Sequence, residues 1–228
     1  MTDFRLQRLN MVESQVRPSD VTDQRIIRAM LEVPRELFVP PALASMAYMD
    51  EPVPVLAGDR RGEGRHLLAP RTFAKLVHLA EVGPDSAVLD VGCASGYSTA
   101  VLARLARRVV AVEPDQELAQ QAVRVLESLD AGGATVLRGP LPAGAPAEGP
   151  FDAILLNGAV PAVPRALLEQ LADSGRLVAI VADAAASPPQ LGRAQVWRRA
   201  GNTFDARPAF DAGAAPLPGF EAPAGFVF

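Results

Sequence analysis

The residues with the clearest chemical potential lie from Ala87 to Tyr97, in the order A-V-L-D-V-G-C-A-S-G-Y. The apolar β-forming residues at its start predict a buried parallel strand over 87–91, and the glycines after it predict a tight turn. Helix-compatible residues follow over 98–106. The amide N–H groups of such a loop and the positive end of the helix dipole point at whatever lies there. This stretch therefore predicts a site for a polar cofactor.

The spacing of the small residues in this loop indicates which cofactor. A dinucleotide fingerprint, G-x-G-x-x-G, starting at Gly92 would need glycines where the chain has Ala94 and Tyr97. The pattern that fits is acid-x-Gly-x-small-x-Gly, formed by Asp90, Gly92, Ala94 and Gly96. This resembles motif I of class I S-adenosylmethionine-dependent methyltransferases, in which the loop lies against the amino-acid end of the cofactor. A loop amide suits the cofactor carboxylate, and Asp90 would balance its ammonium directly or through water.

A second acid, Glu113, stands at the end of the next predicted strand, 109–113, and 17 residues after Gly96. A carboxylate at that position can accept hydrogen bonds from both ribose hydroxyls, as in Rossmann proteins. An acid at a strand end can also be a solvated charge, but its pairing with the loop at this spacing favours cofactor binding. The cofactor-binding residues predicted from this region are Asp90, Gly92, Cys93, Ala94, Ser95, Gly96, Glu113 and Pro114.

Six stretches of sequence narrow the family. They are M-V-E-S-Q-V (11–16), A-M-L-E-V-P-R-E-L-F-V-P (29–40), A-Y-M-D (47–50), V-L-D-V-G-C-A-S-G-Y (88–97), P-F-D-A-I (150–154) and V-P-R-A-L-L-E-Q-L (163–171). Together they resemble the protein-L-isoaspartate O-methyltransferases over about residues 11 to 182. The resemblance implies a Rossmann-like methyltransferase fold with an N-terminal helical addition and S-adenosyl-L-methionine as cofactor. It also implies methyl transfer to the α-carboxylate of L-isoaspartyl residues in damaged proteins or peptides.

The chain departs from that family at two positions. The family carries T-I-S-x-P ahead of its first core helix and its serine is treated as catalytic, whereas this chain reads His66-Leu67-Leu68-Ala69-Pro70, which puts Leu68 in the serine's place. The family also has a G-D-G turn whose acid contacts the adenine end of the cofactor. Here the turn reads Gly139-Pro140-Leu141, so that Pro140 occupies this cofactor-binding position without a carboxylate.

These departures weaken or redirect activity without excluding it. Methyl transfer to a carboxylate needs no general base, because an acid with a pKa near 4 is already ionised at neutral pH. Alignment of the reacting oxygen behind the methyl carbon then supplies up to about 7–11 kcal/mol. Loss of one well-placed polar contact in a site that excludes water costs about 10²–10³ in rate, which is the expected effect of Leu68. The loss of a charge-assisted bond at Pro140 would weaken cofactor binding by about 1.5–3 kcal/mol.

Few other residues offer chemistry. His66 precedes the Leu68 position and is a candidate for the catalytic site, while His78 sits on a predicted helix and is structural or exposed. Cys93 could supply a thiol, although a small residue packed in a tight turn is the simpler interpretation. Two histidines and one cysteine give no metal-ligand spacing. The chain lacks the N-P-P-Y-type turn of nucleobase amino-methyltransferases, and the predicted substrate pocket is walled by Tyr97, Asn157 and Gly158.

Regular alternation of strand and helix patterns predicts the elements that hold these residues. Strands are expected at 87–91, 109–113, 134–138, 151–157 and 176–182, and helices at 71–81, 98–106, 116–128 and 164–172, which together indicate a doubly wound, mostly parallel α/β sheet. Residues 195–199 and 203–210 predict an antiparallel hairpin at its edge, and 211–225 predict a loop. Two N-terminal helices, over 1–16 and from about 22 to 33, precede an extended or turn-like stretch at 34–41 and a surface loop at 51–66. We expect a helical extension over 1–69 and a cofactor-binding domain over 70–228.

Composition limits the remaining classes. The 228 residues are 49% hydrophobic but contain no apolar run of the roughly 20 residues that span a bilayer. The net charge of −4 and the low aromatic content argue against a nucleic-acid partner. A single cysteine and the absence of a signal-peptide pattern predict a cytoplasmic protein with no membrane partner. Oligomeric state is not indicated.

The hypothesis from the sequence is thus an S-adenosylmethionine-dependent O-methyltransferase that acts on a carboxylate of isoaspartyl residues. A relative with a changed substrate, such as a small-molecule acid, and a non-catalytic relative that binds the cofactor or a protein without turnover stay open as alternatives.

Overall fold

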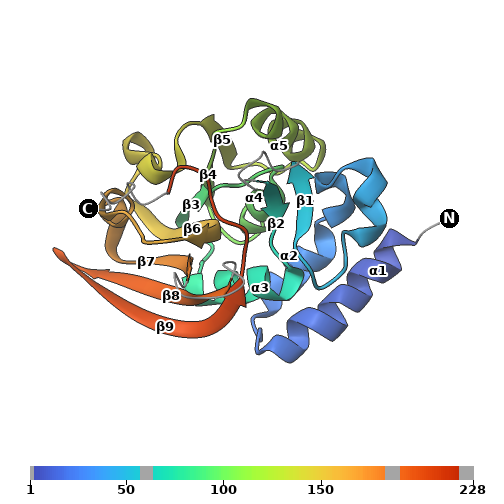
Figure 1. Cartoon of the computed structure of the whole chain (residues 1–228), viewed down its shortest axis with the longest axis horizontal. Helices are drawn as coiled ribbons and strands as arrows, with labels where there is room; N and C mark the ends of the chain where they lie inside the picture. The colour runs from blue at the N-terminus through green and yellow to red at the C-terminus, as the bar shows by residue number, and fades with distance from the viewer. Residues whose placement is uncertain (1–2, 57–63, 183–190, 221–228) are drawn as a thin grey trace, which may run out of the picture.

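A seven-stranded sheet forms the centre of the molecule in the computed structural model, which describes residues 3–56, 64–182 and 191–220 (Figure 1). The strand order is β5-β4-β3-β6-β7-β8-β9, and the pairs from β5 to β7 are parallel. Strand bounds are β3 Ala87–Val91, β4 Arg108–Glu113, β5 Ala134–Arg138, β6 Phe151–Val160, β7 Leu171–Ala182, β8 Leu191–Ala200 and β9 Thr203–Gly213. The predicted fold class and the predicted strands are confirmed.

The order of the chain reverses between β3 and β6, which lie side by side at the middle of the sheet. In doubly wound folds this switch point leaves a crevice outside the carboxyl ends of the strands, where ligands bind. Every residue of β3 is buried, because helices or loops cover both faces of the sheet. Alternate residues belong to two different apolar clusters, with Val88 in one and Leu89 in the other.

The helices of the core are α3 Pro70–Ala80, α4 Tyr97–Leu102, α5 Gln116–Ser128 and α6 Arg165–Leu168. Helix α5 has the predicted bounds, and Asp115 caps it by accepting a 2.9 Å hydrogen bond from the Leu118 amide. Helix α4 ends four residues earlier than expected, because the chain passes into turns before β4. Helix α6 is likewise a single turn rather than the nine residues expected, since β7 already begins at Leu171.

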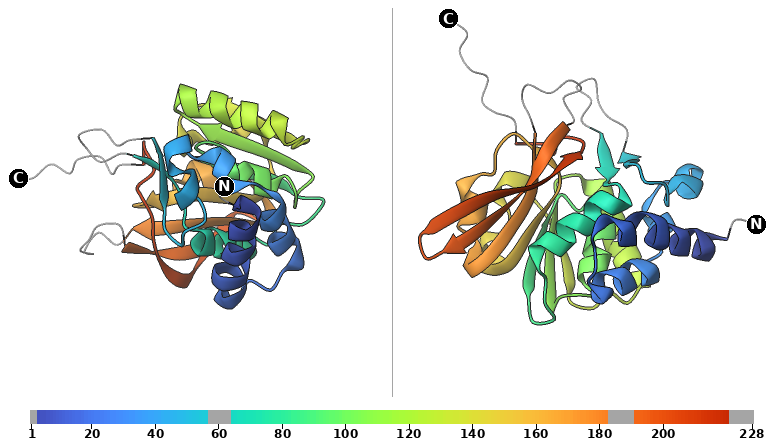
Figure 2. Two further views of the ribbon diagram at one scale, coloured as in Figure 1. Left: turned by 90° about the vertical axis from the view of Figure 1, so that its right-hand side faces the viewer. Right: turned by 90° about the horizontal axis from the view of Figure 1, so that it is seen from below.

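An N-terminal helical layer packs against this core, as expected (Figure 2). Helix α1 (Phe4–Met11) runs into a π-helical turn over Val12–Val16, and α2 (Gln24–Glu32) follows. Residues 34–41 were expected to be extended or turn-like, but Arg35–Phe38 and Pro41–Met46 form short 3₁₀ helices. Apolar residues of the layer share one cluster with α3 and α4, so the core is continuous across residue 69. The domain boundary at that residue stays a prediction.

The surface loop predicted for 51–66 is partly wrong. Its two ends form an antiparallel pair, β1 (Val53–Leu56) and β2 (Arg65–Leu67), with Val53 opposite Leu67. The buried positions of the pair are Val53, Arg65 and Leu67, but the proline, glycine and charged residues around them are typical of a loop. Its middle, 57–63, lies outside the described residues. The pairing matters for the site because it carries Arg65 into the interior.

The C-terminal hairpin is confirmed and is longer than expected. Strands β8 and β9 pair antiparallel through a two-residue turn at Gly201 and Asn202, and residues 211–213 extend β9. Residues 214–220, the last that the structure describes, follow β9 as a loop across the carboxyl end of β6; we call this segment the C-terminal strap (Figure 1). The rest of the loop predicted to 225 lies outside the described residues. Among the described helices none is both long and apolar enough to cross a membrane.

Candidate cofactor and substrate site

The loop between β3 and α4 has the geometry that its small residues predict. Gly92, Ala94 and Gly96 all have positive φ, at 76°, 51° and 98°. A Cβ atom on Gly96 would lie 2.9 Å from the Cβ atom of Ala122 on α5, so only glycine allows the loop to pack there. The small residues therefore hold a tight strand-to-helix turn at the switch point of the sheet.

Asp90 is a buried hub at the end of β3. Its Oδ2 atom accepts hydrogen bonds of 2.7 Å from the Ser98 hydroxyl and 2.6 Å from the Thr99 hydroxyl, and its Oδ1 atom accepts one from the Asn157 amide. Burial raises the pKa of the Asp90 carboxyl, and the three side-chain donors oppose that rise. Because both oxygens are engaged, Asp90 ties β3, α4 and β6 together. Its predicted role toward a cofactor ammonium stays a prediction.

Glu113 lies fully buried at the end of β4, and its carboxylate accepts three hydrogen bonds from donors of this chain. The Oε2 atom accepts hydrogen bonds of 2.7 Å from the Ala94 amide and 2.7 Å from the Arg65 guanidinium, and the Oε1 atom accepts one of 3.3 Å from the Asp115 amide. Arg65 comes from β2 and only 6% of its side chain is exposed. The position is the one predicted for a ribose-binding acid, and a guanidinium of this chain bonds to it; the role toward ribose stays a prediction.

The loop amides are turned toward β4. The amides of Gly92 and Cys93 donate to the Val112 carbonyl oxygen at 2.9 and 3.4 Å, and the Ala94 amide serves Glu113. The Ser95 hydroxyl donates to the carbonyl of Phe38. The predicted cradle for the amino-acid end of a cofactor thus stays a prediction, because these groups bond within the protein.

Cys93 is a buried neutral thiol rather than a nucleophile. Its side chain is 1% exposed, and burial together with the nearby Asp90 and Glu113 charges raises its pKa well above the ordinary value. A thiolate is therefore disfavoured at neutral pH. The simpler of the two interpretations of this residue, a small side chain packed in a turn, agrees with the structure.

Two leucines lie over the glycine loop. A Cβ atom on Gly92 would come within 2.8 Å of Leu217 Cδ2, within 3.2 Å of Arg65 Nη2 and within 3.4 Å of Leu141 Cδ1. On the β6 side, a Cβ atom on Gly158 would lie 2.8 Å from Leu217 Cγ. These side chains fill the space in front of the loop.

The other predicted site residues near the loop differ in exposure and in secondary structure. Pro140 is exposed and begins the short helical turn that buries Leu141 against the loop. Pro114 is half-buried next to Glu113. Asn157 was expected to end a strand, and it lies together with Gly158 inside β6, where the pairing with β7 is irregular between Leu155 and Ala159. That irregularity turns this part of the strand toward the site.

The space left between these groups is very small. A cavity of about 10 Å³ remains beside the loop, whereas binding sites for small molecules and cofactors measure about 300–1,000 Å³. The residue types fit S-adenosylmethionine, but in this arrangement the volume does not. The cavity is lined by Arg35, His66, Leu67, Leu68, Phe73, Gly92, Cys93, Ala94, Tyr97, Ser98 and Asn157.

The predicted substrate side meets the cofactor side in this cavity. Leu68 is 6% exposed, and its carbonyl accepts a 2.7 Å hydrogen bond from the Arg35 guanidinium. The guanidinium also stacks on Tyr97, 4.6 Å from the ring centroid. His66 is half-buried, with Nδ1 at 3.2 Å from the Gly64 carbonyl oxygen. The structure therefore brings Leu68, His66, Tyr97 and the loop into one wall.

Sequence reasoning missed three residues that shape the site. Arg65 stood in a stretch that was interpreted as exposed loop, and Leu217 stood in an Ala-, Pro- and Gly-rich tail. The apolar Leu217 and Phe220 in that tail were the available signal, because a solvated loop has no need of them. Arg35 was part of a family pattern, but nothing local to it indicated a fully buried guanidinium.

A sheet of this order, with a glycine loop at its switch point and an acid at the end of the neighbouring strand, defines a class I methyltransferase. A model of the protein-L-isoaspartate(D-aspartate) O-methyltransferase family matches residues 7–198. The protein-L-isoaspartate O-methyltransferase of Trichlorobacter lovleyi is 40% identical over 183 residues, which cover 80% of this chain and 82% of that one. The corresponding protein of Methanoculleus marisnigri is 39% identical over 78% of each chain. The chain belongs to this family, and it is a methyltransferase that uses S-adenosyl-L-methionine.

Solved structures agree on the fold. A protein-L-isoaspartate O-methyltransferase superposes with a TM-score of 0.78 at 23% identity, over 93% of this chain and 66% of that one. A protein of the same type from Plasmodium falciparum, solved in complex with S-adenosyl-L-homocysteine, superposes with a TM-score of 0.72 at 19% identity, over 95% and 99% of the two chains.

Proposed function

We propose that this chain methylates the carboxylate of isoaspartyl residues in proteins or peptides. Family membership with the loop at 90–96 retained supports the methyl transfer, and S-adenosyl-L-methionine supplies the methyl group when it is bound. The acceptor is ionised at neutral pH and needs no base, so the residues of the chain act by positioning it and by excluding water. The comparisons offer nothing in favour of a non-catalytic relative.

The observation that best supports a carboxylate as the methyl acceptor is a pair of buried donors in the cavity wall. The Nη1 atom of Arg35 and the hydroxyl of Tyr97 lie against each other and make no well-formed hydrogen bond to any described residue. Arg35 is fully buried, and burial lowers its pKa; the neutral Tyr97 and Tyr48 side chains, rather than a carboxylate, oppose this shift. A buried cation without an acidic partner is costly, and an anionic acceptor would provide one.

Leu68 faces the same cavity and sets the expected rate. A serine there would donate a hydrogen bond to the acceptor, whereas the leucine side chain can only pack beside it. We expect slow methyl transfer by the wild type and a rate at least about 10-fold higher for Leu68→Ser. His66 is the other candidate beside this position, as a residue that lines the acceptor pocket.

The test is transfer of a labelled methyl group from S-adenosyl-L-methionine to an isoaspartyl peptide, with the aspartyl isomer of the same peptide as substrate control. Leu191→Ser makes the same change at a half-exposed position on β8 and is expected to leave the rate unchanged. Turnover of the isoaspartyl peptide alone supports the proposal. Transfer only to small-molecule acids indicates a changed substrate and overturns it. Cofactor binding without any transfer, in the wild type and in Leu68→Ser, overturns it in favour of a non-catalytic relative.

A further inference from the structure

Two parts of the chain that are far apart in the sequence fill the space in front of the cofactor loop. One is Arg65 on β2, and the other is the C-terminal strap, residues 214–220. We propose that Arg65 and Leu217 set the cofactor affinity of this enzyme by competing with S-adenosyl-L-methionine for its own site. The inference rests on the proposed use of that cofactor and adds the residues that control its entry.

Arg65 competes through charge. Its guanidinium lies 2.7 Å from Glu113 Oε2, and the two side chains are 6% and 0% exposed. The ribose hydroxyls would donate to this same carboxylate, whose oxygens already accept bonds from Arg65 and from two backbone amides. A buried ion pair has strong mutual attraction, but its guanidinium can leave when water or another donor replaces it. The three bonds to Glu113 take three of the about four acceptor positions of a carboxylate, so Glu113 cannot accept from both ribose hydroxyls while Arg65 stays.

The strap competes through volume. It is held to β6 by two backbone hydrogen bonds, from the Ala159 amide to the Ala215 carbonyl at 2.9 Å and from the Leu217 amide to the Ala159 carbonyl at 2.8 Å. These bonds place the Leu217 side chain over Gly92 and Gly158, and only 4% of it is exposed. Burial of an apolar side chain of this size stabilises the strap in place. The same burial excludes any other molecule from the loop.

The two competing groups meet at one point. A Cβ atom on Gly92 would touch both Leu217, at 2.8 Å, and Arg65, at 3.2 Å. Both groups therefore lie against the same glycine, and the cavity of about 10 Å³ on the other side of the loop holds at most about one water molecule. We infer a closed state in which Arg65 and Leu217 take the place of the cofactor. An open state, with both displaced, binds it.

With competition of this kind, the apparent affinity for the cofactor equals the affinity of the open state multiplied by the fraction of molecules that are open. If one molecule in a hundred is open, the apparent Kd is about 100-fold higher than that of the open state. A variant that loses one competing group should recover part of that factor. We expect Arg65→Ala and Leu217→Ala each to tighten cofactor binding by at least about 10-fold.

Calorimetric titration of the full-length protein with S-adenosyl-L-homocysteine and with S-adenosyl-L-methionine measures this directly. Arg193→Ala and Leu191→Ala are the matched controls, because both residues are exposed on β8 and outside the site. Their Kd should equal that of the wild type. Arg65→Ala and Arg65→Met both leave Glu113 buried without its cation, but Arg65→Met keeps the apolar stem of the side chain, so the pair of variants separates lost charge from lost packing. Circular dichroism checks that each variant folds.

Two further measurements follow the strap itself. In hydrogen exchange, addition of S-adenosyl-L-homocysteine should speed exchange of the Leu217 amide, which the strap bond protects. Cys93 is the single cysteine of the chain and lies in the cavity wall. Its alkylation by iodoacetamide should be faster in Arg65→Ala and Leu217→Ala than in either control.

Tighter binding by the site variants, with unchanged controls, supports the proposal whether or not an isoaspartyl peptide is methylated. Equal Kd values for the wild type and both site variants overturn it and leave the proposed methyl transfer standing. Absence of binding by every variant overturns it as well, because the competing groups are then not what keeps the cofactor out. Protection of the Leu217 amide that is unchanged or increased on cofactor binding contradicts displacement of the strap.

Discussion

The floor of the site and its cover are built in different ways. The floor is the loop between β3 and α4 with Asp90 beneath it. Its polar groups bond to one another, and Asp90 alone accepts hydrogen bonds from three buried side chains. The cover consists of Arg65, Leu141 and the strap, which is held to β6 by two backbone bonds. The floor is therefore rigid, whereas the cover depends on a few contacts that can be exchanged. A site with a fixed loop and an exchangeable cover can hold its catalytic geometry while changes in the cover adjust its affinity for the cofactor.

The largest expected effect tests the rigidity of the floor. Asp90→Ala removes the only described partner of the Ser98 and Thr99 hydroxyls and takes one acceptor from Asn157. Each buried donor left without a partner costs about 1–3 kcal/mol, so we expect the free energy of unfolding to fall by about 3 kcal/mol or more. Urea denaturation measures it.

Asp211→Ala is the control for that variant, because Asp211 is an exposed acid on β9. Its free energy of unfolding should change by less than about 0.5 kcal/mol. A loss below about 1 kcal/mol in Asp90→Ala would show that the hub adds little to the floor. The contrast between floor and cover would then lose its main support.

The floor could be predicted from the sequence and the cover could not, for a physical reason. Strand β3, the positive-φ loop and Glu113 follow from the pattern of residues close together in the chain, and the apolar periodicity of α5 predicted its bounds correctly. Arg65 and Leu217 are 152 residues apart, and their meeting over Gly92 depends on the pairing of β1 with β2 and of the strap with β6. Local composition made both stretches resemble exposed loops.

A smaller effect is expected from the backbone of the loop. Gly96→Ala forces a Cβ atom to within 2.9 Å of Ala122 Cβ at a φ of 98°, so it combines steric overlap with backbone strain. We expect a loss of about 2–3 kcal/mol in the free energy of unfolding. Gly201→Ala is the matched control, because its φ of 59° is also positive but its Cβ position is open, and it should cost only about 1 kcal/mol.

A double variant separates the two contributions at Gly96. Ala122→Gly removes the atom that the new Cβ meets, so Gly96→Ala combined with Ala122→Gly should lose less than the sum of the single variants. Strict additivity in thermal or urea unfolding would mean that the loop does not pack against α5 as the structure has it. The cofactor loop would then owe its shape to φ preference alone.

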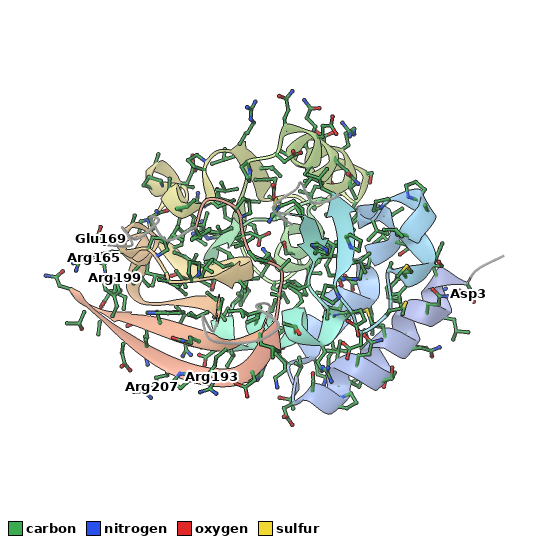
Figure 3. The ribbon with its side chains drawn as sticks, in the orientation of Figure 1. Asp3, Arg165, Glu169, Arg193, Arg199 and Arg207 are labelled. Atoms are coloured by element: carbon green, nitrogen blue, oxygen red, sulfur yellow. The ribbon has the colours of Figure 1, made fainter. Side chains whose placement is uncertain are left out.

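The last comparison sets the buried ion pair of the cover against an exposed ion pair, whose loss should have the smallest effect. Arg193 on β8 lies at the rim of the molecule (Figure 3). Asp211 is its cross-strand partner on β9, with Arg193 Nε 2.8 Å from Asp211 Oδ1. The Arg65–Glu113 pair has nearly the same N–O distance, 2.7 Å, but differs in burial: its side chains are 6% and 0% exposed, whereas those of Arg193 and Asp211 are 59% and 77% exposed. Water screens such a pair, so Arg193→Ala should change the free energy of unfolding by at most about 0.5 kcal/mol, and less in high salt. Arg65→Ala, which leaves a buried carboxylate, should cost about 3–5 kcal/mol. If the two losses were equal, Glu113 would have found water or another donor without Arg65, and the guanidinium would not be what closes the site.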